Sequence, residues 1–498
     1  MTVNSVSYAP IPQDLSASGN TLAPRRITSW FGAGSRPRSR GIAIVVVTFL
    51  GLLAFIYLGN FSLFFNPQDP QWASDATSFE PIFLKEDQLP QHNLSAPYPE
   101  GKTGRYLRFS NQVWGLGWNN LLQERLLNTI LAYSAERAPV FSPFEAWASR
   151  AHPPRGDTNM AGQRDVLKIP YNALLSGPTS GMPWGPNDQH PRAVSQKYWE
   201  VVCPGSERRV VNADEVMKQV GRESDGIKML TDWAKLMRDM PERCVEIQGT
   251  QVFDFYLIGS TRILSLWETF KNHPTVRLLE DSEVVKNGVR ENMSKLQKID
   301  GAQRPYIPKT TGTIEGLLGI HIRRGDYRGD LGKDNGHCFG LGRWGATYSG
   351  WSQLPEMHDK YDSPSREGVE GGQYTPEIKE YYLKHCLPTP RQVIARIQEI
   401  QRESHTHLSH IFVANNAEDE YLADLRQELV ADGWEADNIV TSKDLRLNWQ
   451  ATSVSNVVDM AILARAEVFI GNGWSSMTSN IVMRRLTTGQ TPASTRLW

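Results

Sequence analysis

Two adjacent arginines end an apolar run in the stretch GIHIRRGDY, residues 319–327. The run predicts a strand, and alternation along a strand sends Arg323 and Arg324 to opposite faces of a sheet. Ligands of open α/β sheets bind beyond the carboxyl ends of the strands, and a guanidinium holds a phosphate through two parallel hydrogen bonds. The stretch therefore predicts an anion site in which Asp326 orients one arginine. The alternative is an exposed Arg–Asp ion pair at a turn, which would contribute little to stability.

A glycine- and asparagine-rich turn, GLGWNN at 115–120, precedes a predicted helix. Gly115 and Gly117 let a backbone approach a ligand closely, and the free N–H groups of a helix start favour phosphate. Asn119 and Asn120 add side-chain amides. The pattern lacks the lysine of a P-loop and the third glycine of a dinucleotide-binding fingerprint. An ordinary strand-to-helix turn with an asparagine N-cap is the alternative.

A third block, FIGNGWSSMTSN at 469–480, runs from a predicted strand into a predicted helix. Gly471 and Gly473 lie in the turn, and Ser475 and Ser476 open the helix. Hydroxyl groups and free backbone N–H groups at a helix start can hold an anion. Simple N-capping by serine accounts for one hydroxyl of this cluster but not for the whole of it.

The hydrophobic periodicity predicts two α/β halves around a cleft. In the first half, strands are expected at 106–112 and 139–141 around a helix at 121–137. In the second half, strands and helices alternate, which favours a parallel sheet covered on both faces. The expected strands are 316–324, 410–416, 438–442 and 467–472, and the expected helices are 390–403, 418–433, 456–466 and 475–486.

Residues 325–375 hold eleven glycines and show almost no regular pattern. A loop of this length without secondary structure is usually functional or disordered. Its aromatic side chains suit sugar or peptide binding, and they equally suit plain loop packing. They are Trp344, Tyr348, Trp351 and Tyr361.

The N-terminal part predicts a membrane anchor. Residues 41–65 carry no charged side chain, over more than the roughly 20 residues that span a bilayer. Five arginines precede this segment and acidic residues follow it, which places residues 1–40 in the cytosol by the positive-inside rule. A cleaved signal peptide and a buried core helix are the alternatives. The proline-rich residues 66–104 predict an extended stem.

This topology predicts a single-pass type II protein of the Golgi or endoplasmic reticulum membrane with a lumenal catalytic part. The four cysteines, Cys203, Cys244, Cys338 and Cys386, then permit two disulfides in any of three connectivities, and four free buried thiols are the alternative. Asn93 and Asn292 lie in N-glycosylation sequons. The 53 basic and 54 acidic side chains give a net charge of −1, so no global field attracts nucleic acid.

The three blocks, in this order, resemble those of the GDP-fucose-dependent fucosyltransferase superfamily, which includes the protein O-fucosyltransferases and the α1,6-fucosyltransferases. HIRRGD resembles the H-x-R-R-x-D signature of the superfamily, and the similarity extends over about residues 105–486. It implies a GT-B fold of two Rossmann-like domains facing a cleft. We place an acceptor-side domain at 105–310 and a donor-binding domain at 311–490. It also implies metal-independent, inverting transfer of fucose from GDP-fucose to a protein or glycan, with no cofactor.

The resemblance also implies roles for individual residues. Arg323 would bind the β-phosphate and stabilise the departing GDP, with Arg324 secondary. His321 and Asp326 would shape the donor site. Asp459 would contact the guanine base. The pyrophosphate would be held by a further set of residues, namely Gly117, Asn119, Asn120, Ser475, Ser476 and Thr478.

One position departs from the family pattern. Some protein O-fucosyltransferases have a glutamate that acts as general base between the two glycines of the first block, where this chain has Leu116. The acceptor hydroxyl would then be activated by Asp326 or Asp330, or it would react without a general base. Two other functions stay open: transfer of another nucleotide-activated sugar, and a degenerate transferase that acts as a lumenal glycan-binding scaffold. The acceptor itself cannot be deduced from the sequence.

Overall fold

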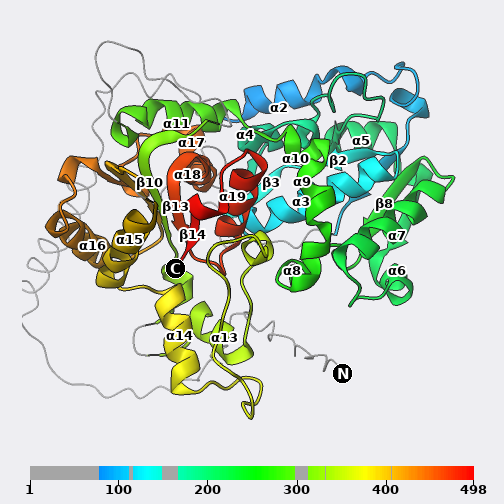
Figure 1. Ribbon diagram of the computed structural model, residues 1–498. Helices are drawn as coiled ribbons and strands as arrows, with labels where there is room; N and C mark the ends of the chain where they lie inside the picture. The colour runs from blue at the N-terminus through cyan, green and yellow to red at the C-terminus, as the bar shows by residue number, and fades with distance from the viewer. Residues whose placement is uncertain (1–77, 112–115, 148–165, 298–311, 331–332, 405) are drawn as a thin grey trace, which may run out of the picture. The chain divides into compact units, whose positions relative to one another are not determined.

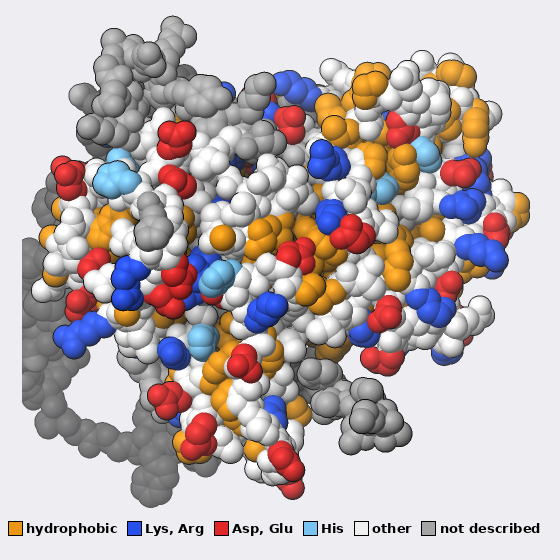
Figure 2. Space-filling view, viewed as in Figure 1, with side chains coloured by type: hydrophobic (Ala, Val, Ile, Leu, Met, Phe, Trp, Pro, Cys, Tyr) orange, Lys and Arg blue, Asp and Glu red, His pale blue; other side chains and the backbone are white. Residues whose placement is uncertain are grey.

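The computed structural model describes residues 78–111, 116–147, 166–297, 312–330, 333–404 and 406–498 (Figure 1). The predicted anchor at 41–65 lies outside these ranges. Within them, no helix has both the length and the apolar character needed to cross a membrane. Acidic and basic side chains are interspersed on the face shown in Figure 2, in keeping with the balanced composition.

The prediction of an extended stem up to residue 104 is wrong for its described part. Helix α2 (Glu80–Asp87) begins directly after Phe79, which is buried against the core. Gln91 is fully buried and donates hydrogen bonds to the carbonyls of Gly181 and Ala193 at 2.9 and 2.7 Å. These residues belong to the same compact unit as the rest of the described chain. Proline content alone misled the prediction, because the prolines here start short helices at positions that need no N–H donor.

The first sheet has five strands in the order β6-β2-β1-β8-β7, and all its neighbouring strands are parallel. The helices α3 (Trp118–Ser134), α5 (Gln196–Val202), α6 (Ala213–Val220) and α7 (Gly226–Asp239) belong to this half. In α7, Met229, Trp233 and Met237 recur at a spacing of four and are buried, as expected of a helix that packs one face on a sheet. The strands are β1 (Tyr106–Phe109), β2 (Ala138–Phe141), β6 (Val194–Ser195), β7 (Arg208–Asn212) and β8 (Cys244–Gln248).

The second sheet also has five parallel strands, in the order β12-β11-β10-β13-β14. Its central strand β10 (Ile314–Ile322) is buried over its last six residues, which fits the near-continuous apolar sequence of a strand covered on both faces. The prediction of an α/β fold with parallel sheets is thus confirmed. The other strands are β11 (His410–Asn415), β12 (Ile439–Thr441), β13 (Ala466–Gly471) and β14 (Thr495–Leu497), and the helices are α15 (Pro390–Ser404), α16 (Asp419–Ala431), α18 (Ser455–Arg465) and α19 (Ser476–Thr487).

Shorter elements join the two sheets. Helix α11 (Glu283–Leu296) packs against α4 (Tyr171–Leu174) on one side and against α17 (Trp449–Ser453) and α18 on the other. The remaining elements are the hairpin β3 (Phe144–Trp147) with β4 (Val166–Ile169), the pair β5 (Leu175–Ser176) with β9 (Glu280–Asp281), and the helices α8 (Phe255–Ile258), α9 (Trp267–Asn272), α10 (Pro274–Arg277), α12 (Gly325–Arg328), α13 (His337–Trp344) and α14 (Pro376–Cys386).

The segment 325–375 is not the structureless loop that its glycines suggested. It contains α12 and α13, and the side chains of Tyr348 and Trp351 pack into the core, with Tyr361 packed against it. Tyr348 and Trp351 are 2% and 1% exposed. The ring of Trp351 lies 5.0 Å from that of Trp267 and 4.6 Å from that of Phe270. Because Tyr348 and Trp351 are buried, they serve in core packing and do not form a surface for an acceptor.

The cysteines form two disulfides, Cys203–Cys244 and Cys338–Cys386. Asn93 is exposed, whereas the expectation of a glycan at Asn292 is wrong for the folded protein. The Asn292 side chain is fully buried and is bonded through both amide atoms: Nδ2 donates to the carbonyls of Gly288 and Arg446, and Oδ1 accepts from the Arg446 N–H.

A buried ion triad ties the two halves together. Asp281 of β9 is 1% exposed and lies 2.5 Å from both Arg465 of α18 and Arg484 of α19. Burial would raise the pKa of Asp281, but the two arginines outweigh it and hold the pKa below its ordinary value. The carboxylate is therefore charged at neutral pH and balances two buried cations.

Replacing Asp281 with Asn should lower the free energy of unfolding by about 3–5 kcal/mol, because two buried guanidinium groups lose their counter-ion. Urea unfolding followed by tryptophan fluorescence measures this change. The control Asp232→Asn breaks an exposed pair with Lys228 and should cost at most about 1 kcal/mol. Equal effects of the two variants would show that the triad contributes no more than a surface pair.

Candidate functional site

The carboxyl ends of the second sheet bring the sequence-predicted residues to one edge. Strand β10 ends before Arg323, β11 before Asn416, β12 before Ser442 and β13 before Asn472. Because these strands are parallel, all four ends lie at the same edge of the sheet, where open α/β sheets bind their ligands. The turn after β13 leads into α19.

Arg323 and Asp326 form an ion pair that is joined by two hydrogen bonds. The Arg323 Nε and Nη2 atoms donate to the two Asp326 oxygens at 2.9 and 2.8 Å, and the guanidinium lies over the ring of Tyr327. The Asn416 amide donates to Asp326 as well, at 3.1 Å. The Arg323 side chain is 36% exposed, so it is held in a fixed direction while part of it stays open to solvent.

Arg324 points into a different environment. Its Nε donates to Glu418 at 3.2 Å, its guanidinium stacks over Tyr421 at 4.2 Å, and its side chain is 14% exposed. Its backbone N–H donates to Asn416 at 2.7 Å. Arg324 therefore fastens the strand end to the start of α16, while Arg323 is the arginine of the pair that a ligand can reach.

His321 is a neutral link between two of the sequence blocks. It is buried, and its Nδ1 lies 2.9 Å from the hydroxyl of Thr478, which is fully buried. Burial, joined by the charge of Arg323, lowers the pKa of His321 to about 3. The ring is therefore uncharged at neutral pH, and the contact is a hydrogen bond that fixes strand β10 against α19.

The start of α19 leaves its backbone N–H groups without a side-chain cap. Ser475 occupies the N-cap position, but its side chain makes no capping hydrogen bond, so serine capping does not explain this block. Ser475 is buried and Ser476 is half-buried. Gly473 is required by packing, because a Cβ there would lie 2.5 Å from the Tyr348 ring. Free N–H groups and the helix dipole favour an anion at this position.

The first block docks on the same helix. Asn480 of α19 donates to the backbone carbonyl of Asn119 at 2.9 Å, and Gln123 of α3 donates to Ser479 of α19 at 2.6 Å. Asn119 is half-buried and Asn120 is exposed. Figure 1 shows α19 between the strands of the second sheet and α3. A single helix turn thus contacts both other blocks.

Glycine is not required at position 117, contrary to the expectation from sequence. Gly117 is exposed with a φ of −63°, and a Cβ added there would meet no atom within 4 Å. Neither backbone strain nor a close neighbour within the described residues explains the glycine. Gly115 lies outside the described residues.

Asp459 presents a buried carboxylate oxygen without a partner. Its Oδ2 accepts from the hydroxyl of Ser442 at 2.7 Å, whereas Oδ1 is buried with no hydrogen bond among the described residues. Burial raises the pKa of Asp459 to about 7. Asp459 lies in α18 and is bonded to Ser442, the residue that follows β12. A buried acceptor without a partner at this place fits a ligand that supplies N–H donors.

The carboxylates proposed as general base are poorly suited to that role. Burial alone would raise the pKa of Asp326, but its bonds to Arg323 and Asn416 hold the pKa below its ordinary value. Asp330 is exposed and paired with Lys333. A general base needs a pKa near the working pH, so the geometry makes Asp326 a positioning residue for Arg323.

Several residues that complete the site were not predicted. Asn416 and Glu418 hold the arginine pair, Asn480 and Gln123 join α3 to α19, and the Tyr327 hydroxyl donates to the Trp474 carbonyl at 3.1 Å. Asn416 had a signal in the sequence, since two asparagines end the strand HIFVANN. Among the described residues, no group of three or more His, Cys, Asp or Glu side chains is arranged to hold a metal ion.

Two parallel α/β sheets, with an arginine and an uncapped helix start at one sheet edge, suit the class of proteins that bind a nucleotide or another phosphate-bearing ligand. Within that class, residues 247–488 match the family model described as GDP-fucose protein O-fucosyltransferase. The match, over just under half of the chain, confirms the resemblance to the GDP-fucose-dependent fucosyltransferase superfamily and supports a glycosyltransferase of the fucosyltransferase type.

Two solved structures show a distant similarity. POFUT1 in complex with GDP-fucose is 14% identical with a TM-score of 0.45, over 79% of this chain and 97% of that chain. A mutant of Arabidopsis thaliana FUT1 in complex with GDP is 9% identical with a TM-score of 0.31, over 83% of this chain and 74% of that chain. No curated protein matches the sequence. The family match carries the assignment.

Asp459→Asn should stabilise the protein in a pH-dependent way. An unfolded aspartate titrates near pH 4, roughly, whereas the folded-state pKa is about 7. Between these values the native state holds a proton that the unfolded state has lost, so wild-type stability falls as pH rises through this window. The asparagine variant keeps an acceptor for Ser442. Because asparagine does not ionise, the stability of the variant does not decrease in this way as pH rises.

The variant should therefore unfold at a higher temperature than the wild type above about pH 7, with the difference vanishing near pH 4. Thermal unfolding followed by circular dichroism over this range measures it, with Asp437→Asn, an exposed aspartate, as the control. A difference that does not depend on pH would refute the buried, proton-binding state of Asp459.

Proposed function

We propose that the protein transfers fucose from GDP-fucose to an acceptor hydroxyl, with the donor at the carboxyl edge of the second sheet. The observation that carries the proposal is Arg323, held by two bonds from Asp326 at the end of β10 and 36% exposed. The uncapped start of α19 lies at the end of the neighbouring strand β13. A cation and a helix start at one edge suit a pyrophosphate.

The reaction breaks the bond between C1 of fucose and the β-phosphate oxygen, and the electron pair of that bond stays on GDP. The acceptor oxygen forms a new bond to C1 and loses its proton to solvent or to a buffer base. Negative charge grows on the leaving phosphate, so Arg323 and the N–H groups of α19 stabilise the transition state more than the ground state. Departure of GDP drives this step, and a general base is not essential.

Asp459 would read the guanine base. The edge of guanine presents an N1–H and a 2-amino group side by side, and a carboxylate accepts both. The buried Oδ1 without a partner is the group that such a contact would satisfy. This role favours a guanine nucleotide over a uracil nucleotide, which has no such pair of donors.

We further propose that residues 41–65 anchor the chain as a single-pass type II protein, with the catalytic part in the lumen of the Golgi or endoplasmic reticulum. The uncharged segment and the arginines before it support this topology. The two disulfides support it as well, because disulfides persist in oxidising compartments.

A donor panel tests the activity. The full chain, purified in detergent, is titrated with GDP-fucose, GDP-mannose and UDP-N-acetylglucosamine, and nucleotide release is measured for each. GDP-fucose should bind most tightly and release GDP. Preferential turnover of another donor would overturn the fucosyl assignment, and binding of no nucleotide sugar would overturn the transferase function.

Arg323→Lys should lower the rate of fucose transfer by about 10²–10³-fold, because lysine cannot make the paired hydrogen bonds that a guanidinium makes to phosphate. Asp326→Asn should lower the rate less, and the double variant should be no slower than Arg323→Lys alone, since both act through one group. Initial rates of GDP release measure all three. Additive losses would assign Asp326 a separate role, such as that of a base.

N-glycosylation of the exposed sequon at Asn93 tests the proposed topology. After expression in a eukaryotic cell, an endoglycosidase should increase the gel mobility of the protein, and Asn93→Gln should abolish this shift. The control Asn60→Gln, within the predicted anchor, should leave the shift intact. Absence of a glycan from the wild type would contradict the lumenal orientation proposed for this part of the chain.

A further inference from the structure

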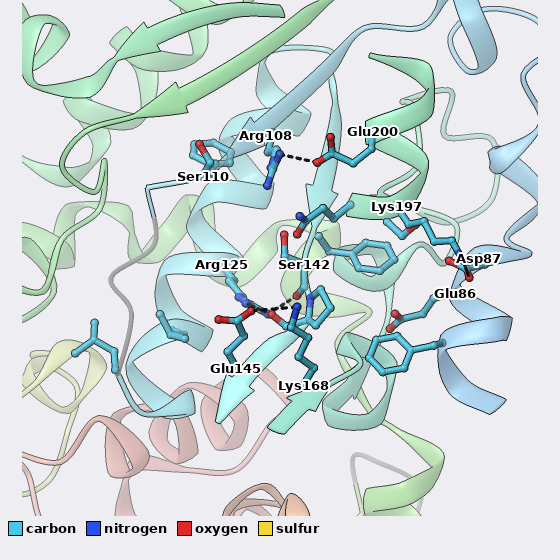
Figure 3. A pocket seen from close by; sticks show the side chains of 18 of the residues that line it. Glu86, Asp87, Arg108, Ser110, Arg125, Ser142, Glu145, Lys168, Lys197 and Glu200 are labelled. Atoms are coloured by element: carbon cyan, nitrogen blue, oxygen red, sulfur yellow. Dashed lines mark hydrogen bonds and ion pairs between the residues drawn. The ribbon is translucent and has the colours of Figure 1, made fainter. Parts of the chain in front are cut away.

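A cavity of about 560 Å³ opens at the carboxyl edge of the first sheet. Its floor is formed where β1, β2 and β6 end, at Ser110, Ser142 and Ser195. Its walls come from α2, α3, α5 and the β3–β4 hairpin. In Figure 3, Glu86 of α2 lies across this space from Arg125 of α3, and Asp87 lies beside Lys197. The cavity is separate from the arginine site, which belongs to the second sheet.

The size of the cavity favours a compact ligand. Pockets for small molecules hold about 300–1,000 Å³, whereas recognition of a folded protein surface takes about 800 Å² of contact on each partner. A serine or threonine side chain would leave most of this volume empty. Two or three sugar rings are of the right order of size to fill it.

The charges that line the cavity are nearly balanced. Three cations pair with three carboxylates: Arg108 with Glu200 at 3.0 Å, Lys197 with Asp87 at 2.5 Å and Lys168 with Glu145 at 3.7 Å. A net field of one sign would select a phosphate, an acidic peptide or a basic peptide. Paired charges instead offer hydrogen-bonding groups to a neutral molecule.

Two polar groups in the lining have unused hydrogen-bonding capacity. Glu86 is 4% exposed, and Asn172 bonds to only one of its oxygens, through the backbone N–H and the side-chain amide at 2.8 and 3.2 Å. Glu86 makes no ion pair within the described residues, and burial raises its pKa to about 6. The buried Nε of Arg108 likewise finds no acceptor among those residues. A ligand with hydroxyl groups supplies both a donor and an acceptor.

Aromatic rings complete the lining. Phe83, Phe109 and Phe141 come from α2, β1 and β2 and border the cavity. A saccharide has C–H faces that pack on such rings and hydroxyl groups around its edge that reach charged side chains. Binding sites of this kind combine apolar walls with a few placed polar groups.

We propose that this cavity is the acceptor subsite and that it takes the end of a neutral oligosaccharide, so that the fucose goes to a sugar hydroxyl of a glycan. The inference rests on the proposed fucosyl transfer. Leu116 lines the cavity, and three residues later Asn119 contacts α19. The chain thus leads within three residues from the cavity wall to the helix whose start faces the donor, and Glu86 lines the cavity as the residue that selects the acceptor.

Binding of sugars without donor tests the inference. The full chain is studied by saturation-transfer NMR with chitobiose, N-acetyllactosamine and cellobiose. At least one should bind, and Glu86→Gln should weaken it about tenfold, because the amide still accepts from Asn172 but loses a charged acceptor for sugar hydroxyls. Glu291→Gln, an exposed glutamate on α11, should have no effect. Phe83→Ala, which removes a half-buried ring, should weaken binding as well.

The two proposals fail in different ways. If GDP-fucose neither binds nor releases GDP, the transferase function is wrong. If GDP-fucose binds but none of the three sugars does, or if sugars bind equally well to wild type, Glu86→Gln and Phe83→Ala, the acceptor subsite is wrong while the transferase function stands. Transfer to an unglycosylated serine- or threonine-containing peptide in the presence of these sugars, without competition from them, would also overturn the subsite.

Discussion

The candidate site depends on one turn of helix α19. Thr478 meets His321 at the end of β10, and Asn480 meets Asn119 at the start of α3, so three blocks that lie far apart in the chain join within one turn of the helix. Burial, with the charge of Arg323, lowers the pKa of His321 to about 3, so this link is uncharged at neutral pH. Since the same turn leaves its own N–H groups uncapped, the contacts that assemble the site also leave an anion-binding helix start in place.

The adjacent residues Arg323 and Arg324 have different roles in the structure. Strand alternation sends their side chains apart, and the neighbours on each side then decide the outcome. Arg324 meets Glu418 and Tyr421 and becomes part of the framework, whereas Arg323 meets Asp326 and keeps a third of its side chain exposed. Because Asp326 is bonded to Arg323 and Asn416, its pKa is held below the ordinary value, which does not suit a general base.

Much of the fold could be predicted from local patterns. The strand expected at 316–324 spans Ile314–Ile322, and the helix expected at 475–486 spans Ser476–Thr487, because parallel strands and their covering helices have strong apolar periodicity. Strand β8 was missed, since five residues, CVEIQ, carry too little pattern. The residues before 105 and the segment 325–375 were misjudged because their order comes from tertiary contacts: buried Gln91 in one case, and buried aromatics with a disulfide in the other.

The chemistry of the site was predictable in its residue types but not in its partners. Nothing in the sequence shows that Asn480 pairs with a residue 361 positions away, or that an N-glycosylation sequon is buried at Asn292. The cavity of the first sheet could not be predicted either, because its lining comes from separate helices and strands between Glu80 and Glu200 that only folding brings together. Such features exist only once the chain has folded.

The central claim is that the three blocks form one nucleotide site around α19. Amide hydrogen exchange of the full chain, measured by mass spectrometry with and without GDP, tests it most directly. The account predicts that GDP slows exchange together in peptides covering 116–123, 323–328 and 475–480. Protection confined to one of these segments, or located elsewhere in the chain, would contradict it.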